Sequence, residues 1–193
     1  MCNVQRWQKR VGLLGGSFDP PHKGHLHIAK QALIRFDLDE VWWIVSPGNP
    51  LKARQPAPIE TRIKMARAMI ANSRIHVSDI EAQLGTRYTS ETLAQFQNLY
   101  PKTRFVWLMG ADNLVQFDKW QDWRWIMENI DIGVLARSTD PLAALNARAA
   151  RMYRNRRLPA SQAKRLGRGK RALWCYLPIS RVDLSSSEIR AQK

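Results

Sequence analysis

Cysteine is scarce in this sequence, and a long hydrophobic run is absent. The 193 residues include only Cys2 and Cys175, whose separation matches no metal-binding spacing. Nowhere do about 18 consecutive apolar residues occur, which excludes a membrane-spanning helix. The apolar run near the start is also too short for the core of a signal peptide. These absences predict a cytoplasmic protein of a reducing compartment, with no membrane partner.

Acidic residues are absent between Asp140 and Asp183, a region that contains eleven lysines and arginines. The rest of the chain is nearly balanced, with 20 basic and 16 acidic residues. The region could bind nucleic-acid phosphates, or it could be a solvated basic surface near a site for polyanionic small molecules. Residues 148–171 contain no aromatic residue except Tyr153 and no recognisable nucleic-acid module. The second interpretation is therefore favoured over nucleic-acid binding.

Short apolar runs alternate along the chain with segments of helical spacing. The apolar runs lie at residues 11–14, 41–45, 104–109, 132–136 and 173–177, with a shorter candidate strand at 75–77. Such runs are typical of parallel strands that are covered on both faces. Apolar residues spaced three or four apart predict helices at 24–36, 59–73 and 89–100.

This alternation predicts an α/β fold, a Rossmann-like three-layer arrangement around a mostly parallel central sheet. We interpret residues 1–193 as a single domain with a basic helical insertion at about 141–171. Right-handed crossovers would place a ligand at the carboxyl ends of the strands, near the point where the strand order reverses. Four tryptophans within predicted strands are expected in the core: Trp42, Trp43, Trp107 and Trp174.

The first predicted strand is followed by GGSFDPPHKGH, residues 15–25. Gly15 and Gly16 would permit positive φ and let a ligand approach the backbone closely. The prolines keep this loop out of helix until the next helix begins, whose N-terminal N–H groups suit a phosphate. His22 and His25 flank that helix start and can reach the same anion through imidazole N–H groups.

Spacing alone leaves other interpretations of this loop open. A single histidine near a glycine loop is usually a surface residue or a helix cap. The loop has neither the GxGxxG order of a dinucleotide site nor the GK[ST] of a Walker loop. A zinc site would need further ligands, and His27 and His76 do not obviously provide them. Phosphate binding and capping remain the two main alternatives, and zinc is the weakest.

Five segments, taken in order, carry a resemblance to a known family. They are GGSFDPPHKGHL (15–26), PGNPLK (47–52), RYTSETL (87–93), LMGADN (108–113) with the later Trp120, and LSSSEIR (184–190). Together they resemble the H-x-G-H type of the nucleotidyltransferase α/β superfamily, and specifically its bacterial nicotinate-nucleotide adenylyltransferases. The resemblance covers roughly residues 11–190, nearly the whole chain.

The resemblance implies adenylyl transfer from ATP to nicotinate mononucleotide, which gives nicotinate adenine dinucleotide and pyrophosphate. The residues that it implies for the reacting phosphates are His22, His25, Lys52 and Arg190. The residues that it implies for nucleotide contacts are Gly15, Gly16, Ser17, Phe18, Thr89, Gly110, Asp112, Trp120, Ser185 and Ser186. Magnesium would accompany ATP, held mainly by phosphates and water.

Several of these residues also have an ordinary structural interpretation. Ser185 and Glu188 have the capping-box spacing of a final helix. Asp112 could accept a hydrogen bond from a ribose hydroxyl or cap the helix that follows it. Trp120 could stack on the pyridine ring or pack in the core, and Lys52 could simply be solvated.

The sequence departs from the family pattern at two places, and rival functions remain. Arg87 stands where a small residue is expected, and the chain stops soon after Arg190. Phosphopantetheine adenylyltransferase shares the histidine loop, but its motif usually has threonine at the position of His22. Nicotinamide mononucleotide is an alternative acceptor, and a homo-oligomer stays open. A nucleic-acid-binding protein with a degenerate site would not need the intact pair of His22 and His25.

Overall fold

A parallel β-sheet forms the centre of the computed structural model, which describes residues 9–48, 56–136 and 141–180. Its strands are β1 (Lys9–Gly16), β2 (Glu40–Val45), β3 (Ile75–Ser78), β4 (Thr103–Met109), β5 (Asp131–Ala136), β6 (Arg157–Leu158) and β7 (Trp174–Pro178). The order across the sheet is β3-β2-β1-β4-β5-β7-β6, and every pairing is parallel. The predicted Rossmann-like α/β fold is confirmed.

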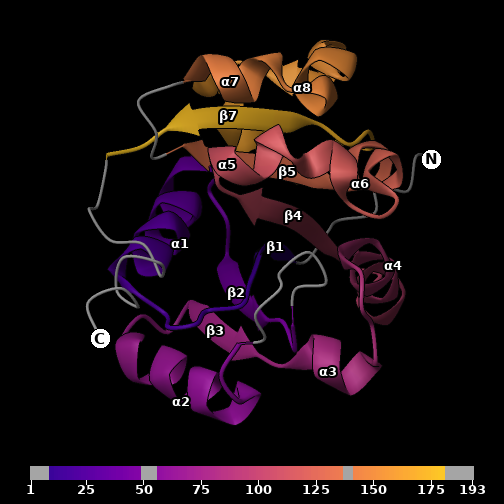
Figure 1. Cartoon of the computed structure of the whole chain (residues 1–193). Coiled ribbons are helices and arrows are strands. Elements are labelled where there is room, and N and C mark those ends of the chain that lie inside the picture. Colours follow the sequence, from indigo (N-terminus) through magenta and orange to yellow (C-terminus); the bar gives the residue numbers. More distant parts are fainter. Residues whose placement is uncertain (1–8, 49–55, 137–140, 181–193) are drawn as a thin grey trace, which may run out of the picture.

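Helices cover both faces of this sheet (Figure 1). They are α1 (Lys23–Arg35), α2 (Ile59–Met69), α3 (Ile80–Leu84), α4 (Thr89–Leu99), α5 (Ala111–Val115), α6 (Trp123–Asn129), α7 (Pro141–Asn146) and α8 (Arg148–Met152), with 3₁₀ turns η1 (Phe117–Lys119), η2 (Arg154–Arg156) and η3 (Ala160–Arg165). The predicted helices correspond to α1, α2 and α4, although α2 ends at Met69, four residues early. Within the described residues no helix is long and apolar enough to cross a membrane.

Successive residues of the strands point to opposite faces, and both faces are buried. On β1, Val11 and Leu13 belong to a core cluster formed with α4, α5, α6, α7 and α8. Leu14 belongs to a second cluster formed with α1, α2 and η3. This double burial explains why the strands appear in the sequence as continuous apolar runs. The sheet is therefore the middle of three layers.

Three of the four tryptophans predicted in the core are buried there. The exposed fractions of Trp43, Trp107 and Trp174 are 0%, 3% and 2%. Trp42 differs, because it is only half-buried against the first cluster. Its indole N–H donates to Glu40 at 3.0 Å, near the start of β2. An indole beside a polar partner at the edge of the core keeps its N–H satisfied, which full burial would have made harder.

The basic segment, residues 141–171, contains α7, α8, η2 and η3, and it also contributes the short strand β6, which the sequence analysis did not predict. The two residues of β6 pair in parallel with β7, and Arg157 aligns with Trp174. A strand of two residues, preceded by charges, carries no apolar run that the sequence analysis could detect. The Arg157 guanidinium lies 5.4 Å from the Trp174 ring centroid, a cation–π distance.

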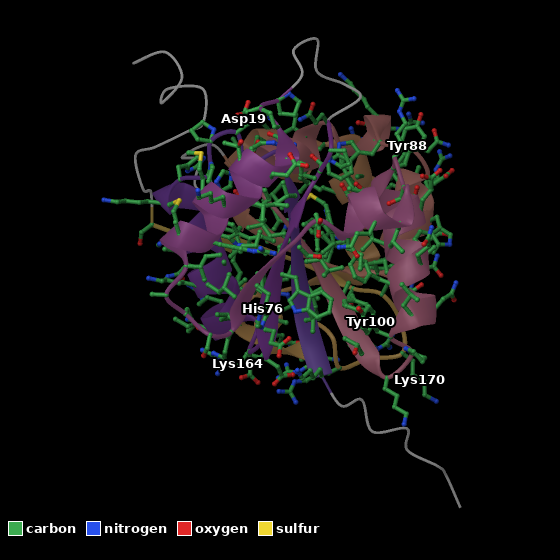
Figure 2. The ribbon with its side chains drawn as sticks, turned by 90° about the horizontal axis from the view of Figure 1, so that it is seen from below. Asp19, His76, Tyr88, Tyr100, Lys164 and Lys170 are labelled. Atoms are coloured by element: carbon green, nitrogen blue, oxygen red, sulfur yellow. The ribbon has the colours of Figure 1, made fainter. Side chains whose placement is uncertain are left out.

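The end of the basic segment is attached to the amino ends of the strands. Gly167 and Leu173 donate backbone hydrogen bonds to Asp131 at 2.9 and 2.8 Å. Arg104, near the start of β4, donates to the carbonyl of Gly169. Figure 2 shows Lys164 and Lys170 at the end of the molecule opposite Asp19. These residues of the basic segment therefore lie far from the carboxyl ends of the strands, where a ligand was expected.

Asp131 is the residue on which this attachment depends, and its replacement gives a first prediction. Asp131→Asn puts an amide NH₂ in place of one acceptor oxygen, so one buried N–H loses its partner. We expect the free energy of unfolding to fall by about 1–3 kcal/mol in urea titrations. Asp118→Asn is the control, because Asp118 is half-buried and has no hydrogen bond from its side chain in the described part of the chain. An equal loss in both variants would contradict the prediction.

A comparison of the wild type with Asp131→Asn also tests how the free energy of unfolding depends on pH. Burial raises the pKa of Asp131 from 3.8 to about 6, although the N–H groups of Leu173 and Gly167 and the charge of Arg104 oppose the rise. A carboxyl with a raised pKa binds more protons in the folded state, so its contribution to stability falls between about pH 4 and about pH 6 and is constant above that. The stability difference between wild type and Asp131→Asn should thus be larger near pH 5 than near pH 7.

Candidate active site

The strand order reverses between β1 and β4, and the candidate site lies at this point. From β1 the sheet continues to β2 and β3 on one side, and to β4 and β5 on the other. Leu14 of β1 aligns with Leu108 of β4, so the two strands end at about the same level. The chain leaves them through Gly15 and Gly16 and through Gly110. Crevices at such reversals are the usual ligand sites of open parallel sheets.

The lack of a side chain at Gly15 leaves space for the Trp107 ring and does not serve a turn with positive φ. A Cβ atom built on Gly15 would lie 2.2 Å from the Trp107 ring, closer than any real contact. A Cβ on Gly16 would meet Phe18 at an ordinary 3.4 Å. The expected positive φ is wrong for both glycines, because the positive φ of this loop falls on Phe18, at 46°. The chain therefore adopts the left-handed conformation two residues after Gly16, at Phe18, beside the histidines.

The two histidines close the start of α1 by reciprocal hydrogen bonds. His22 Nδ1 accepts from the Gly24 N–H at 3.1 Å, and His25 Nδ1 accepts from the His22 N–H at 3.2 Å. A backbone N–H can only donate, so each Nδ1 must be unprotonated, and the neutral rings carry their proton on Nε2. The ring centroids are 3.8 Å apart, and His22 is 4% exposed. Capping and phosphate binding are thus compatible: Nδ1 holds the helix start while Nε2–H can donate to an anion.

Phe18 packs against the pair of His22 and His25 from the core side. Its ring lies 4.7 Å from that of His25 and stacks on Trp43 at 4.9 Å with an interplanar angle of 13°. The side chain is 1% exposed, so the ring belongs to the core. What Phe18 can offer a ligand is its backbone.

The loop after β4 lies beside the loop after β1 at the same end of the sheet. Gly110 is the N-cap of α5, and a Cβ on it would lie 2.3 Å from Asp112 Oδ1. Asp112 is exposed and makes no capping hydrogen bond through its side chain, but its charge lies in the first turn of α5, where it is favourable. Trp120 is half-buried, with its ring centroid 6.2 Å from that of Trp107. Trp107 therefore links Gly15 on one strand end to Trp120 near the other.

Thr89 is the first residue of α4, whose start Glu91 caps. Glu91 accepts from the N–H groups of Arg87 and Tyr88 at 3.1 and 3.2 Å. Arg87 is exposed and lies over the Tyr88 ring at 5.9 Å. Figure 2 shows Tyr88 at the same end of the molecule as Asp19. The start of α4 and the histidine loop thus share the carboxyl end of the sheet.

A half-buried carboxyl, that of Glu81, lies near this helix start. Burial raises the pKa of Glu81 to about 7, and a hydrogen bond from Thr92 partly opposes the rise. The Thr92 hydroxyl is 3.4 Å from Glu81 Oε1 and 2.8 Å from the Thr86 hydroxyl. This network fixes the turn between α3 and α4, on which Thr89 depends for its position.

The sequence analysis missed Arg62, a buried cation beside the first loop. Arg62 is 1% exposed, and its guanidinium donates to the backbone carbonyl of Ser17 at 2.5 Å. Burial lowers its pKa, while the negative charges of Asp19 and Glu60 oppose this. A signal was present in the sequence, because Arg62 falls on the apolar stripe of its helix, three residues after Ile59.

The remaining predicted residues cannot be placed. Lys52, Ser185, Ser186 and Arg190 lie outside the residues that the structure describes. Among those described, no three histidine, cysteine, aspartate or glutamate side chains gather closely enough to hold a metal ion.

The comparisons with known proteins show the family of this chain. The model of the family described as cytidylyltransferase-like matches residues 13–192, and the chain belongs to this family. Within it, the chain belongs with the nicotinate-nucleotide adenylyltransferases. It is 56% identical to a probable nicotinate-nucleotide adenylyltransferase of Cereibacter sphaeroides, covering 94% of this chain and 96% of that one. A protein of the same description from Brucella abortus is 42% identical, covering 93% of both chains.

The fold agrees with that of a solved enzyme. The structure is similar to the nicotinic acid mononucleotide adenylyltransferase of Plasmodium falciparum complexed with NaAD, with a TM-score of 0.71 at 19% identity over 95% of this chain and 83% of that one. The family resemblance of the five sequence segments is confirmed.

The contact between Gly15 and Trp107 gives the third prediction. Gly15→Ala forces the Trp107 ring to move, and overpacking of this kind costs about 1–3 kcal/mol in the free energy of unfolding. Gly110→Ala is the matched control, since its Cβ would meet only the exposed side chain of Asp112, which can rotate away. Urea titrations followed by tryptophan fluorescence measure both. Similar losses of unfolding free energy in the two variants would contradict the prediction that a Cβ at Gly15 clashes with Trp107.

Proposed function

We propose that this chain transfers the adenylyl group of ATP to nicotinate mononucleotide, which gives nicotinate adenine dinucleotide and pyrophosphate, a step of NAD biosynthesis. The observation that carries the proposal is the pair of His22 and His25 at the start of α1, where Nδ1 of each ring accepts a hydrogen bond from a backbone N–H. Membership of the nicotinate-nucleotide adenylyltransferase family supports it.

The reaction is an in-line substitution at the α-phosphorus of ATP. A phosphate oxygen of the mononucleotide forms the new P–O bond, and the bond from the α-phosphorus to the bridging oxygen breaks. Pyrophosphate leaves with the electron pair, so no covalent enzyme intermediate is needed. Such a transfer requires mainly positioning and neutralisation of the developing charge.

The first loop and α1 supply hydrogen-bond donors and a partial positive charge for ATP. His22 and His25 donate from Nε2 to phosphate oxygens, and the N-terminus of α1 adds its partial positive charge. The backbone from Gly15 to Phe18 approaches the nucleotide. Lys52 and Arg190 would add charge at the phosphates, and Ser185 and Ser186 would contact them from a second helix start.

The acceptor would lie on the side of β4 and α4. Trp120 stacks on its pyridine ring, Thr89 hydrogen-bonds its carboxylate, and Asp112 accepts from a ribose hydroxyl near Gly110. The exposed Arg87 makes this end of α4 more positive, which favours a carboxylate over an amide. Nicotinate mononucleotide is therefore proposed as the acceptor in preference to nicotinamide mononucleotide.

Magnesium would enter with ATP. Mg²⁺ commonly keeps several waters and binds substrate phosphates, so the proposed site needs no carboxylate cage of its own. Bound in this way, the ion would neutralise part of the triphosphate charge. We further propose that the chain acts in the cytoplasm. The molar mass in solution, measured by light scattering, would show whether the chain forms a homo-oligomer.

The proposal predicts pyrophosphate release from ATP and magnesium with nicotinate mononucleotide. His25→Ala removes a donor to the developing charge and should lower kcat by about 10²–10³-fold. His76→Ala is the control, because His76 is exposed on β3, 3.8 Å from Glu40. Release with phosphopantetheine would reassign the chain within the superfamily, and no release with any acceptor from folded protein would refute the proposal.

Removal of magnesium gives a separate prediction. An excess of a chelator should abolish pyrophosphate release, and added Mg²⁺ should restore it in proportion to the Mg–ATP formed. Thermal unfolding without substrates should be unchanged by the chelator, because the ion is proposed to bind with ATP. Full activity in the chelator would contradict the proposed cofactor.

A further inference from the structure

Arg62 on α2 is a buried cation that the proposed reaction does not use. Its Nε donates to the carbonyl of Ala57 at 2.6 Å. One terminal nitrogen donates to Ser17 and Ser46 at 2.5 and 2.8 Å, and the other to Pro47 at 3.3 Å. All four partners are backbone carbonyls, so the side chain acts on the path of the chain and not on other side chains.

These carbonyls belong to three separate segments at the carboxyl end of the sheet. Ser17 follows β1, Ser46 and Pro47 follow β2, and Ala57 precedes α2. The N–H of Ser46 also donates to Gly16 at 3.0 Å, so the two strand ends are tied directly as well. A planar guanidinium can serve several carbonyls at fixed angles, which a lysine ammonium on its flexible stem cannot reproduce.

The hydrogen bond to Ser17 determines the orientation of one peptide group. In a trans peptide the C=O and the N–H point in opposite directions. Because Arg62 holds the Ser17 carbonyl toward α2, the N–H of Phe18 points away from α2. In the described part of the chain no hydrogen bond uses this N–H. The ring of Phe18 contacts that of His25, with the centroids 4.7 Å apart, so residue 18 adjoins the proposed phosphate donors.

We propose that Arg62 is a positioning residue of the nucleotide site, which fixes the Ser17–Phe18 peptide so that the Phe18 N–H can donate to ATP. The inference rests on the proposed function for the identity of the ligand. The positive φ of Phe18 fits this role, because that conformation is held in place by the surrounding contacts. Arg62 itself touches no substrate.

A purely structural role for Arg62 makes a different prediction. The protein would lose stability, but each folded molecule would bind ATP and turn over as the wild type does. The positioning role predicts a change in ATP use by molecules that are fully folded. The two are separated by assays well below the unfolding temperature, with the folded fraction measured by circular dichroism.

The test compares Arg62→Lys and Arg62→Met with Arg67→Met. Arg67 is the matched control, since it is an exposed arginine in the last turn of the same helix. We expect kcat/KM for ATP to fall about 100-fold in Arg62→Lys, the scale of a small misplacement of a reacting group. The KM for nicotinate mononucleotide should change little. If Arg62→Met does not fold, Arg62→Lys, which keeps the charge and much of the volume, carries the test.

Calorimetric titration with a non-hydrolysable ATP analogue makes the test independent of turnover. Weaker binding to folded Arg62→Lys than to wild type and Arg67→Met supports the inference. Wild-type affinity and kinetics in folded Arg62→Lys would overturn it. If the wild type releases no pyrophosphate, the proposed function fails, and the analogue titration still decides whether Arg62 acts on ATP binding. If the wild type does not bind the analogue either, the inference fails with it.

Discussion

The strand β1 is hydrogen-bonded along both edges and buried on both faces, and this constraint organises the molecule. A strand so enclosed has its polar backbone satisfied and its side chains in two cores, so it can meet solvent only at its ends. Its carboxyl end is also where the strand order reverses. The residues that follow β1 therefore leave the core at the crevice, and their identity decides what the crevice can hold.

The loop after β1 meets two demands with the same two side chains. The helix that follows begins with N–H groups that need acceptors, and two histidine rings provide them through Nδ1. Satisfying the helix start also selects one tautomer of each ring, which leaves the opposite nitrogen as a donor. The hydrogen bonds that cap the helix are thus also the ones that place the ring proton on Nε2. Phe18 and Trp43 stabilise this arrangement from the core.

Much of this could be predicted from the sequence, because the relevant signals are local or carried by motifs. The apolar runs located six of the seven strands, and the glycine and histidine spacing located the loop. Two features could not be derived in the same way. The strand β6 is held by tertiary pairing with β7 rather than by its own composition. Arg62 shares a helix face with apolar residues, but its carbonyl partners come from segments far apart in the sequence, which only the fold brings together.

The attachment of the basic segment to Asp131 and Arg104 has a consequence for how such a protein can change over time. Residues 167–173 are held at the amino ends of the strands, and the candidate site is at the carboxyl ends. The length of the strands separates the two. Substitutions that alter the charge of this segment's exposed residues, such as Lys170 and Arg171, can therefore accumulate without disturbing the geometry of the candidate site. The chemistry of the candidate site thus constrains the residues at the carboxyl end of the sheet, whereas exposed residues at the amino end are constrained mainly by folding.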